Sequence, residues 1–501
     1  MDRRYLVALD QGTTSSRAIV FTLAGSPVSA AAQEFTQHYP RPGWVEHQPE
    51  DLLDTTLRAL RGALEQGGIQ PSEIAAIGIA NQRETTLIWE RETGKPLGRA
   101  IVWQCRRTAP LVERLKQDGL AWMIQGKTGL VPDAYFSATK IRWLLDEAGA
   151  QARAERGELC FGTVDSFLAW HLVKGRPHVT DATNASRTML FNLEKQDWDE
   201  ELLRLFNIPR ALLPRVADTA ELIGTLDDRF LGAPVPVAAL AGDQHAALFG
   251  QGCFQTGEVK NTYGTGCFML MNTGDRPVSN DKGLLSTMAW RLDGRPAFAL
   301  EGSVFVAGAA IQWLRDELGV IGTAAQSQEL ALKAQDSGGV HFVPAFTGLG
   351  APHWDMYARG TITGLSRGTG AAHLARAALE SIAFQSNDLL ALMADSLGHR
   401  PRALKVDGGA AANDLLMQMQ ADISGIRVLR PQVRETTALG AALLAGLGVK
   451  LFDSPAQAAA RWQLDRAFEP AWTPSLRAQR LDGWSKAVRT ALFEASLRDN
   501  R

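Results

Sequence analysis

Residues 5–23 have the sequence YLVALDQGTTSSRAIVFTL, in which two apolar runs flank a polar turn. Tyr5 to Leu9 and Ala18 to Leu23 are predicted to be strands and Asp10 to Ser16 the turn, because apolar runs around a glycine-containing turn indicate a β-hairpin. The same pattern recurs in Val259 to Met271, VKNTYGTGCFMLM. Two such hairpins predict two domains built on one plan, each offering a turn to a shared ligand.

The rest of the chain alternates between predicted strands and helices. Ile74 to Ala80 and Val235 to Ala241 are short apolar runs with polar neighbours, which predicts buried strands. Apolar residues from His373 to Leu397 recur at helical spacing, and the glycine that follows is placed to end the helix. Leu404 to Asp407 is predicted to be a strand that leads into a helix near Asn413. This alternation is typical of an α/β protein.

Length and composition narrow the class of protein. A chain of 501 residues predicts two to four domains. A net charge of −2 lowers the expectation of nucleic-acid binding, which requires clustered Lys and Arg. The four cysteines are far apart, which favours reduced thiols over a disulfide framework or a zinc site. We find no signal peptide and no apolar run long enough to span a membrane, so a cytoplasmic protein is expected.

The first turn carries groups that suit phosphate oxygens. Gly12 lets the backbone approach a ligand, the hydroxyl and free N–H groups of residues 13–16 donate hydrogen bonds, and Arg17 adds a positive charge. Asp10 lies at the strand end, where it can hold a divalent cation through water. An ordinary hairpin turn also favours Asp, Gly and Thr, so this stretch alone leaves both interpretations open.

Two glycine-rich turns in the second half are weaker candidates of the same kind. In NTYGTGCF (261–268), Gly264 and Gly266 flank Thr265 and expose N–H groups. In VDGGAAAN (406–413), two glycines permit a ring or a phosphate to approach a helix N-terminus. Taken alone, a plain turn is the better explanation of the first motif and an equally good explanation of the second. A nucleoside triphosphate needs donors from both sides, however, which favours the turns acting together, and no G-x-x-x-x-G-K-[ST] loop occurs.

Charged residues follow two of the predicted strands. Asp243 can accept a proton from a substrate hydroxyl while Gln244 hydrogen-bonds to it. The alternative is that Asp243 caps the following helix, which is the commoner use of Asp at this position. Arg83 and Glu84 can bind vicinal hydroxyl groups, one donating and one accepting, and the alternative is a solvated surface pair. His245 is expected to pack rather than to react.

Taken together, these residues resemble the FGGY carbohydrate kinase family, within the actin, Hsp70 and sugar kinase superfamily, and in particular its members that phosphorylate glycerol. The resemblance extends from Tyr5 to about Leu447. The segments that carry it occur in order and at the family's spacing. They are PGWVEHQPED (42–51), ANQRETT (80–86), VWQCRRT (102–108), YFSATKIRWLLD (135–146), TDATNASRTMLFN (180–192), AGDQHAALFGQ (241–251), EGSVFVAGAAIQWLRD (301–316) and VDGGAAAN (406–413).

The resemblance implies an α/β fold of two ribonuclease H-like (actin-like ATPase) domains with a cleft between them. The N-terminal domain, residues 1–252, would bind glycerol and carry the first phosphate loop. The C-terminal domain, residues 253–501, would carry the second phosphate loop and the adenosine site. The protein is expected to form a homodimer or homotetramer, with no nucleic-acid partner.

The resemblance also implies a role for individual residues. Asp243 would be the general base, and Asp10 would help to hold Mg²⁺. The residues that would contact glycerol are Arg83, Glu84, Trp103, Tyr135, Asp243, Gln244 and Phe268. The residues that would bind ATP are Thr13, Thr14, Ser15, Arg17, Thr265, Gly308, Gln312, Gly409 and Asn413.

The implied reaction is the ATP-dependent phosphorylation of glycerol to sn-glycerol 3-phosphate, which feeds glycerol breakdown and glycerolipid synthesis. A related kinase acting on a pentulose, a pentitol or a gluconate-like acid is the alternative within the family, although Trp103 and Phe268 are expected to exclude a longer sugar. A nucleotide-binding sensor or scaffold without activity is the alternative outside it. Asp10, Asp243 and both loops are intact, which argues against the sensor.

Overall fold

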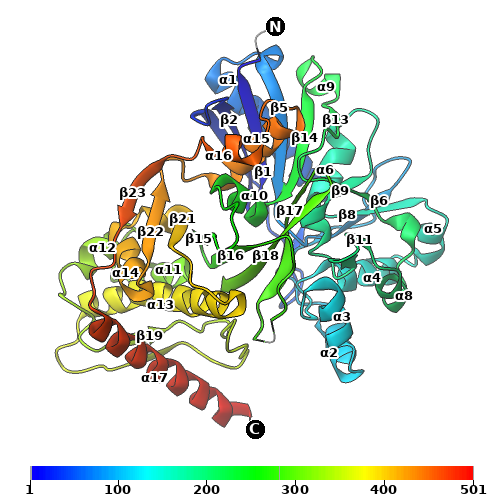
Figure 1. Cartoon of the computed structure of the whole chain (residues 1–501). Coiled ribbons are helices and arrows are strands. Elements are labelled where there is room, and N and C mark those ends of the chain that lie inside the picture. Colours follow the sequence, from blue (N-terminus) through cyan, green and yellow to red (C-terminus); the bar gives the residue numbers. More distant parts are fainter. Residues whose placement is uncertain (1–2, 281, 500–501) are drawn as a thin grey trace.

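The computed structural model describes residues 3–280 and 282–499, and its main feature is a pair of mixed β-sheets (Figure 1). The first has the order β13-β14-β5-β1-β2-β3, and the second has the order β17-β18-β16-β15-β21-β22-β23. The strands of the first sheet are β1 (Tyr5–Gln11), β2 (Ser15–Thr22), β3 (Pro27–Glu34), β5 (Ile74–Asn81), β13 (Gly224–Thr225) and β14 (Pro236–Gly242). Those of the second are β15 (Val259–Tyr263), β16 (Cys267–Gly274), β17 (Leu285–Leu292), β18 (Arg295–Val304), β21 (Ala403–Asp407), β22 (Arg427–Pro431) and β23 (Leu464–Phe468).

The two sheets repeat one pattern of strand pairing. In the first, β1 pairs antiparallel with β2 and parallel with β5, and β14 continues the parallel part. In the second, β15 pairs antiparallel with β16 and parallel with β21, and β22 continues the parallel part. The α/β class with two units of one plan is therefore confirmed, and a domain boundary near residue 252 stays a prediction.

The first hairpin differs from the prediction in its turn. We expected the turn to span Asp10 to Ser16, but β1 runs through Gln11 and β2 begins at Ser15. Asp10 pairs with Arg17 on one side and with Ala80 on the other, so ladders on both sides extend the strand beyond its apolar run. Only residues 12–14 form the turn, which places Asp10 inside the sheet.

Helices and small two-stranded sheets surround the two large sheets. The helices are α1 (Pro49–Gly67), α2 (Ala109–Gln117), α3 (Ala121–Thr128), α4 (Ser137–Glu147), α5 (Gln151–Glu155), α6 (Val164–Leu172), α7 (Ala182–Ala185), α8 (Glu200–Leu205), α9 (Asp228–Leu231), α10 (Asp243–Gly250), α11 (Gly308–Asp316), α12 (Gln326–Ala331), α13 (Ala371–Leu397), α14 (Asp414–Ser424), α15 (Thr436–Gly448), α16 (Pro455–Ala459) and α17 (Pro474–Asp499). The small sheets pair β4 (Glu46–His47) with β7 (Ala100–Ile101), β6 (Leu87–Glu90) with β8 (Leu159–Gly162), β9 (Val179–Asp181) with β12 (Arg215–Ala217), β10 (Phe191–Asn192) with β11 (Asp197–Trp198), and β19 (His341–Val343) with β20 (Thr361–Thr363).

Helices α10 and α15 cross between the two sheets and join them (Figure 1). Although α15 comes from the second half of the chain, it packs on β1, β5 and β14 of the first sheet. The crossing is close because its residues are small. A Cβ on Gly440 would lie 1.8 Å from the carbonyl oxygen of Ala246, and one on Gly250 would lie 2.1 Å from that of Thr436. Glycine is therefore required at both positions.

Gly440→Ala is expected to lower the free energy of unfolding by about 1–3 kcal/mol, because the added methyl group has no space and the helices must separate. Thermal unfolding measures this loss. Gly126→Ala is the matched control, because Gly126 also lies in a helix but has nothing within 4 Å of an added Cβ. The control is expected to be neutral or slightly stabilising. Equal melting temperatures for the two variants would contradict the close crossing.

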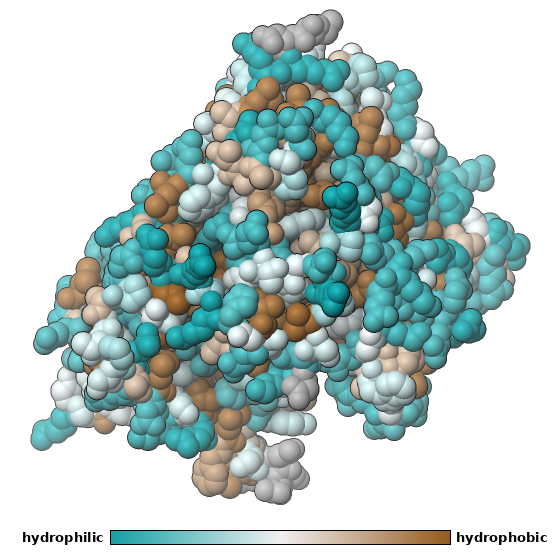
Figure 2. Space-filling view, in the orientation of Figure 1, coloured by the Kyte–Doolittle hydropathy of each residue, from teal (hydrophilic) through white to brown (hydrophobic). Residues whose placement is uncertain are grey.

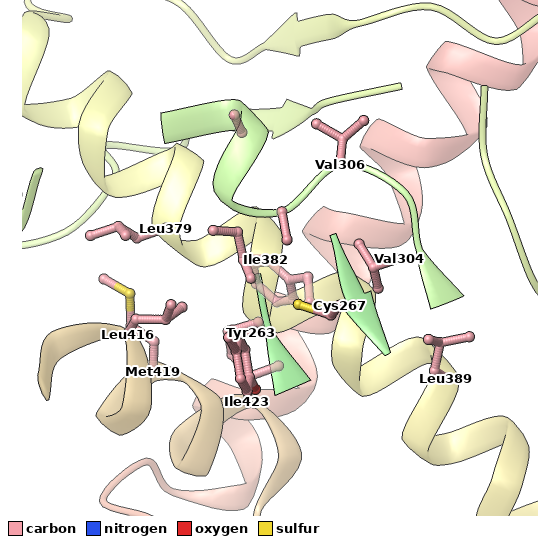
Figure 3. Packing of buried hydrophobic residues seen from close by; sticks show 14 of the residues in the cluster. Tyr263, Cys267, Val304, Val306, Leu379, Ile382, Leu389, Leu416, Met419 and Ile423 are labelled. Carbon is pink, nitrogen blue, oxygen red and sulfur yellow. The ribbon is translucent and has the colours of Figure 1, made fainter. Parts of the chain in front are cut away.

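The second sheet packs against α13 and α14 in a large apolar core (Figure 3). Tyr263 of β15 is fully buried there, and its hydroxyl donates to the Oε1 atom of Gln420 on α14 at 2.7 Å. The predicted helix from His373 to Leu397 is confirmed as α13, and it ends at Gly398, whose φ of 82° is the left-handed conformation that glycine tolerates. This core fixes the strand ends from which the second glycine-rich turns project.

Asp388→Asn is expected to stabilise the protein more at pH 8 than at pH 5. Trp484 of α17 donates its indole N–H to the Asp388 carboxylate at 2.7 Å, but burial outweighs this bond and raises the pKa of Asp388 to about 7. The folded protein thus holds a proton that the unfolded chain, with a pKa near 4, has released, so stability falls as the pH rises from about 4 to about 7. Asn at position 388 still accepts the hydrogen bond from Trp484, but it does not titrate, so the variant does not lose this stability as the pH rises.

Melting temperatures of the Asp388→Asn variant and the unsubstituted protein at the two pH values provide the measurement. We expect a gain of about 1–3 °C at pH 8 and a smaller gain at pH 5. A gain of the same size at both pH values would contradict the titration of Asp388.

The surface is predominantly hydrophilic on the face shown in Figure 2, where apolar side chains occur in small separate groups. Within residues 3–280 and 282–499, no helix is both long enough and apolar enough to cross a membrane. The cysteines are all buried free thiols. The larger apolar side chains gather instead in the cores of the two sheets and in the core that α10 and α15 share with them.

Candidate active site

The carboxyl ends of three parallel strands bring the candidate residues together. Gln11, Asn81 and Gly242 are in register at the ends of β1, β5 and β14. In open α/β sheets, ligands bind outside this edge. The phosphate-loop candidate follows β1, Arg83 and Glu84 follow β5, and Asp243 follows β14. Three motifs that are far apart in sequence therefore meet at one edge of the first sheet.

Asp243 is held with its carboxylate partly exposed. Its Oδ1 atom lies 3.1 Å from Nε of Arg83 and accepts the backbone N–H of Gln244 at 2.7 Å, and 29% of its side-chain surface is exposed. The capping interpretation is wrong: Gly242 occupies the cap position of α10, and Asp243 is already the first helical residue. The backbone N–H that its carboxylate accepts is that of the adjacent Gln244, and no side chain caps α10, so the carboxylate remains available to a ligand.

Arg83 and Glu84 are not a solvated pair, because their exposures are only 3% and 1%. Glu84 has a φ of 61°, a left-handed conformation that costs a non-glycine residue about 1–3 kcal/mol. Its carbonyl oxygen accepts hydrogen bonds from the Thr86 hydroxyl at 2.9 Å, the Ser137 hydroxyl at 3.1 Å and the Lys140 ammonium at 3.3 Å. These three donors hold the strained turn and fix the direction of the Glu84 side chain.

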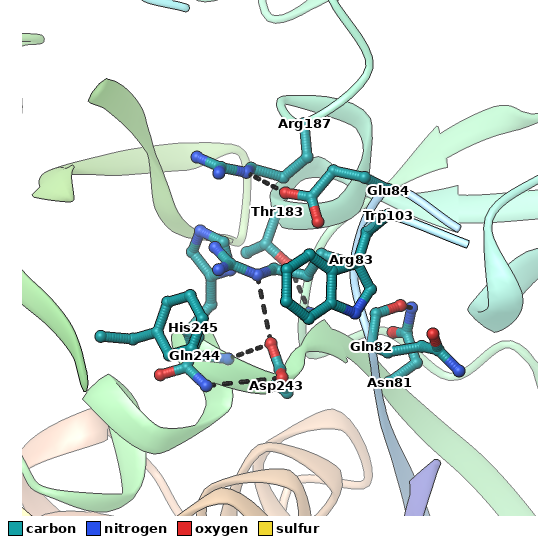
Figure 4. A network of polar contacts seen from close by, with 12 residues as sticks. Asn81, Gln82, Arg83, Glu84, Trp103, Thr183, Arg187, Asp243, Gln244 and His245 are labelled. Carbon is teal, nitrogen blue, oxygen red and sulfur yellow. Dashed lines mark hydrogen bonds and ion pairs between the residues drawn. The ribbon is translucent and has the colours of Figure 1, made fainter. Parts of the chain in front are cut away.

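A chain of ion pairs links Asp243 to Glu84, and Figure 4 shows its two end pairs, Arg83 with Asp243 and Arg187 with Glu84. Arg83 contacts Asp243 and also Glu301, which contacts Arg187, and Arg187 in turn contacts Glu84. Nε of Arg187 donates to Glu84 at 2.7 Å, and its Nη2 donates to Glu301 at 3.0 Å. Burying charges in this way is costly unless each is paired, and here every charge has an opposite partner.

Burial and the neighbouring opposite charges shift the pKa values of the carboxylates in opposite directions. Burial raises the pKa of Glu301, but Arg187 and Arg83 outweigh it and hold the pKa below its ordinary value. Burial raises the pKa of Glu84, and the two arginines offset this only in part. Burial likewise lowers the pKa of His245 far below its ordinary value, so this histidine is neutral and buried as expected. The centre of the network therefore carries a firmly ionised Glu301.

Three half-buried aromatic side chains form a wall beside the charged residues. The ring centroids of Trp103 and Tyr135 are 5.6 Å apart, and those of Trp103 and Phe268 are 6.4 Å apart. The indole N–H of Trp103 donates to the Thr13 hydroxyl at 2.9 Å. Burial raises the pKa of Tyr135, which keeps its hydroxyl protonated. The wall combines residues from both halves of the chain, and the bond from Trp103 to Thr13 connects it to the first phosphate-loop candidate.

The first phosphate-loop candidate is a short, tight turn. Gly12 donates its N–H to the carbonyl oxygen of Ser15 at 2.9 Å. Thr14 is exposed, while Thr13 and Ser15 are partly exposed. Arg17 forms an ion pair with Glu435, the residue that precedes α15. A phosphate that binds Arg17 must therefore share it with this carboxylate or displace it.

The candidates in the second half gather at the corresponding edge of the second sheet. Thr265 is exposed, and its carbonyl oxygen accepts N–H groups of Ala307 and Ala309 at 2.9 and 3.1 Å, which places the start of α11 against this turn. Gly308 is the first residue of α11. Gln312 lies one turn further along α11 and is exposed. These residues form one group, at the end of β15.

The glycine pair after β21 lies beside that group. β21 runs parallel to β15, and a Cβ on Gly408 would meet the carbonyl oxygen of Tyr263 at 2.5 Å, so only glycine fits there. Gly409 is exposed, and Asn413 caps α14 by accepting the N–H of Leu416 at 2.9 Å. The predicted strand, turn and helix are all confirmed here. The nucleotide-binding role of each residue stays a prediction.

Asp10 and Asp243 fit a magnesium ion. Burial, above all, and the neighbouring Asp243 charge raise the pKa of Asp10 to about 7, so the two carboxylates are near enough to repel each other. In the described residues no group of three or more His, Cys, Asp or Glu forms a metal cage. Magnesium commonly uses only one or two carboxylates, and takes its other ligands from water and substrate phosphates. The two aspartates therefore match the donor set expected for a magnesium–nucleotide complex.

Sequence reasoning missed three charged residues of this site, and two of them are Arg187 and Glu301. Both are fully buried charges that contact predicted substrate-binding residues. Each lies in a segment that resembles the family, TDATNASRTMLFN and EGSVFVAGAAIQWLRD. A charged residue within an otherwise apolar or small-residue segment was the available signal. Lys260 is a third such residue: it is fully buried, and its ammonium group bonds to the Thr262 hydroxyl at 2.8 Å and to the side chain of Gln244.

Residues 5–250 match the N-terminal domain of the FGGY family of carbohydrate kinases, and residues 259–449 match its C-terminal domain. The chain belongs to this family. Its similarity is to glycerol kinases within the family. It is 55% identical to the glycerol kinase of Caldanaerobacter subterraneus subsp. tengcongensis, over 98% of this chain and 99% of that one. It is 58% identical to the glycerol kinase of Aromatoleum aromaticum, over 97% and 98%.

Solved structures agree with this placement. The structure of Plasmodium falciparum glycerol kinase with ADP matches at a TM-score of 0.91 and 34% identity, and the match covers 98% of this chain and 99% of that one. A xylulose kinase from Lactobacillus acidophilus matches at a TM-score of 0.86 but only 22% identity, over 97% of each chain, and shares the fold alone.

Proposed function

We propose that this protein transfers the γ-phosphoryl group of ATP to a terminal hydroxyl of glycerol and forms sn-glycerol 3-phosphate. The observation that carries the proposal is the Asp243 carboxylate, which is partly exposed and held by Arg83 at the edge where the phosphate-loop candidate also lies. The similarity to glycerol kinases at 55% and 58% identity supports glycerol as the acceptor.

In this proposal the charged residues bind the hydroxyl groups of glycerol and the aromatic residues bind its carbons. Arg83 donates, Glu84 accepts, and the Tyr135 and Gln244 side chains supply further polar contacts. Trp103 and Phe268 pack on the carbon skeleton. Hydrogen bonds to charged groups are stronger than neutral ones, so a buried Arg and Glu give a small triol most of its affinity and orientation.

Asp243 acts as the general base. It accepts the proton of the terminal hydroxyl as that oxygen forms a bond to the γ-phosphorus, and the bond from phosphorus to the β-phosphate oxygen breaks to release ADP. Thr13, Thr14, Ser15, Arg17 and Thr265 donate to the phosphate oxygens. Asp10 would help to hold a Mg²⁺ ion, which would supply positive charge near the phosphate oxygens. Gly308, Gln312, Gly409 and Asn413 line the adenosine side.

The cellular location and the oligomeric state of the enzyme are proposed from the family resemblance alone. We expect a cytoplasmic location, where ATP is available, and a homodimer or homotetramer. Size-exclusion chromatography with light scattering measures the oligomeric state, and a monomer at micromolar concentration would contradict the second expectation.

The substrate is tested by magnesium-ATP turnover, read as ADP release, with glycerol, xylulose, ribulose, xylitol and gluconate, and with no sugar. We expect kcat/KM for glycerol to exceed that for each longer substrate by at least about 100-fold, because in this proposal Trp103 and Phe268 exclude a longer carbon chain. A preference for a longer sugar would keep the kinase and contradict the role of Trp103 and Phe268. Turnover equal to the blank with all five would favour a nucleotide sensor.

A further inference from the structure

Glu301 is the only member of the buried ion-pair chain in the described residues that comes from the second sheet. It lies on β18, while Arg83, Glu84, Arg187 and Asp243 all come from the first half of the chain. Both nitrogen atoms at the end of Arg83 donate to its two carboxylate oxygens, and the Nη2–Oε1 distance is 3.1 Å. The same Oε1 accepts from Nη2 of Arg187 at 3.0 Å. One carboxylate therefore holds two arginines in fixed directions.

The N–H groups of the two arginines have few other hydrogen-bond acceptors. The Nη1 atom of Arg187 is buried and already has no hydrogen-bond partner, and its other nitrogens bond to Glu84 and Glu301. Among the described residues, the second anionic contact of Arg83 is Asp243, which it reaches through Nε. Without Glu301, the terminal nitrogens of a buried guanidinium lose their acceptors, and the side chain must turn toward Asp243 or Glu84.

Glu301 also lies next to the aromatic wall. In the pairing of β16 with β18, Leu270 is opposite Glu301 and Phe268 is opposite Ser303. The bond from Glu301 to Arg83 joins residues 218 positions apart and so fixes this part of the second sheet relative to the loop after β5. Phe268 thereby keeps its place opposite Trp103.

We infer that Glu301 is a positioning residue for the acceptor substrate: it orients Arg83 and, through Arg187, Glu84, and it keeps Phe268 against the rest of the wall. Glu301 touches neither the nucleotide-loop candidates nor, in this account, the reacting atoms. The inference rests on the proposed function. Its specific consequence is that the loss of Glu301 impairs the use of glycerol while binding of the nucleotide is retained.

The test compares Glu301→Gln with Glu380→Gln. Both replace a buried carboxylate of the second half by its amide, but Glu380 lies on α13, with Arg376 of the same helix as its ion-pair partner at 3.5 Å. For Glu301→Gln we expect KM for glycerol to rise about 10- to 100-fold, while KM for magnesium-ATP and the Kd of ADP stay within about twofold. For Glu380→Gln we expect both KM values to stay unchanged.

If Glu301→Gln does not fold, Glu301→Asp provides a second test of the inference. It keeps the charge, but its carboxylate is one methylene shorter and reaches only one arginine, so KM for glycerol is expected to rise about tenfold. An unchanged KM for glycerol in a folded Glu301→Gln or Glu301→Asp variant would overturn the inference. Equal rises in KM for glycerol and for magnesium-ATP would overturn it as well. Failure of the proposed function would look different, because the unsubstituted protein itself would then not phosphorylate glycerol.

Discussion

Replacing Asp243 by Asn is expected to lower kcat for glycerol phosphorylation by about 10²–10⁴-fold. Asn has the same shape and keeps the hydrogen bond from the N–H of Gln244, which is 2.7 Å from the carboxylate in the native protein. It cannot accept the proton of the attacking hydroxyl, however, and it removes one of the two aspartates proposed to hold the magnesium ion. The structure of α10 is expected to be unaffected, because Asp243 does not cap it.

Initial rates at saturating glycerol and magnesium-ATP measure this effect, with melting temperature as the check on folding. Asp228→Asn is the control, because Asp228 is also the first residue of a helix but pairs with Lys174 on the surface, at 3.3 Å. The control is expected to keep full activity. Near-normal turnover by the Asp243 variant would remove the general base from the account.

Replacing Arg83 by Met is expected to abolish measurable glycerol phosphorylation and to lower the free energy of unfolding by about 3–5 kcal/mol. Met occupies a similar volume but carries no charge. Glu301 would then be a buried carboxylate with Arg187 as its remaining partner, and Asp243 would lose the contact at 3.1 Å that orients it. Leaving a buried charge without its partner costs far more than the pair contributes when it is intact.

Thermal unfolding and initial rates of the Arg83→Met variant provide the measurement. Arg210→Met is the matched control, because Arg210 is 46% exposed and its ion pair with Asp197, at 2.9 Å, is on the surface. Exposed pairs contribute only about 0–1 kcal/mol, so the control is expected to keep its stability and activity. Equal melting temperatures for the two variants would show that the buried chain does not hold the site together.

The strands and the glycine turns were predictable because their signals are local. The apolar runs at Ile74 to Ala80 and Val235 to Ala241 became β5 and β14, and the hairpin at Val259 to Met271 became β15 and β16. The extent of the first turn was not predictable from the hairpin alone. Pairing with β5, a strand more than sixty positions away, carries β1 past its apolar residues.

The partners of the charged residues were beyond the reach of local patterns. Arg83 and Glu84 look like a surface pair when they are read in sequence, because the residues that neutralise them, Glu301 and Arg187, are 218 and 103 positions away. Asp243 looks like a helix cap for a similar reason. Gly242 takes the cap position because its N–H bonds to the Thr183 hydroxyl at 2.9 Å, a contact that only the folded chain creates.

³¹P NMR of the unsubstituted protein with glycerol and magnesium-ATP shows directly whether a phosphoryl group is transferred to glycerol. We expect the γ-phosphate resonance of ATP to be replaced by that of a phosphate monoester on a terminal carbon of glycerol, with one equivalent formed for each ADP. Release of inorganic phosphate without a glycerol ester, or unchanged ATP, would contradict phosphoryl transfer to glycerol.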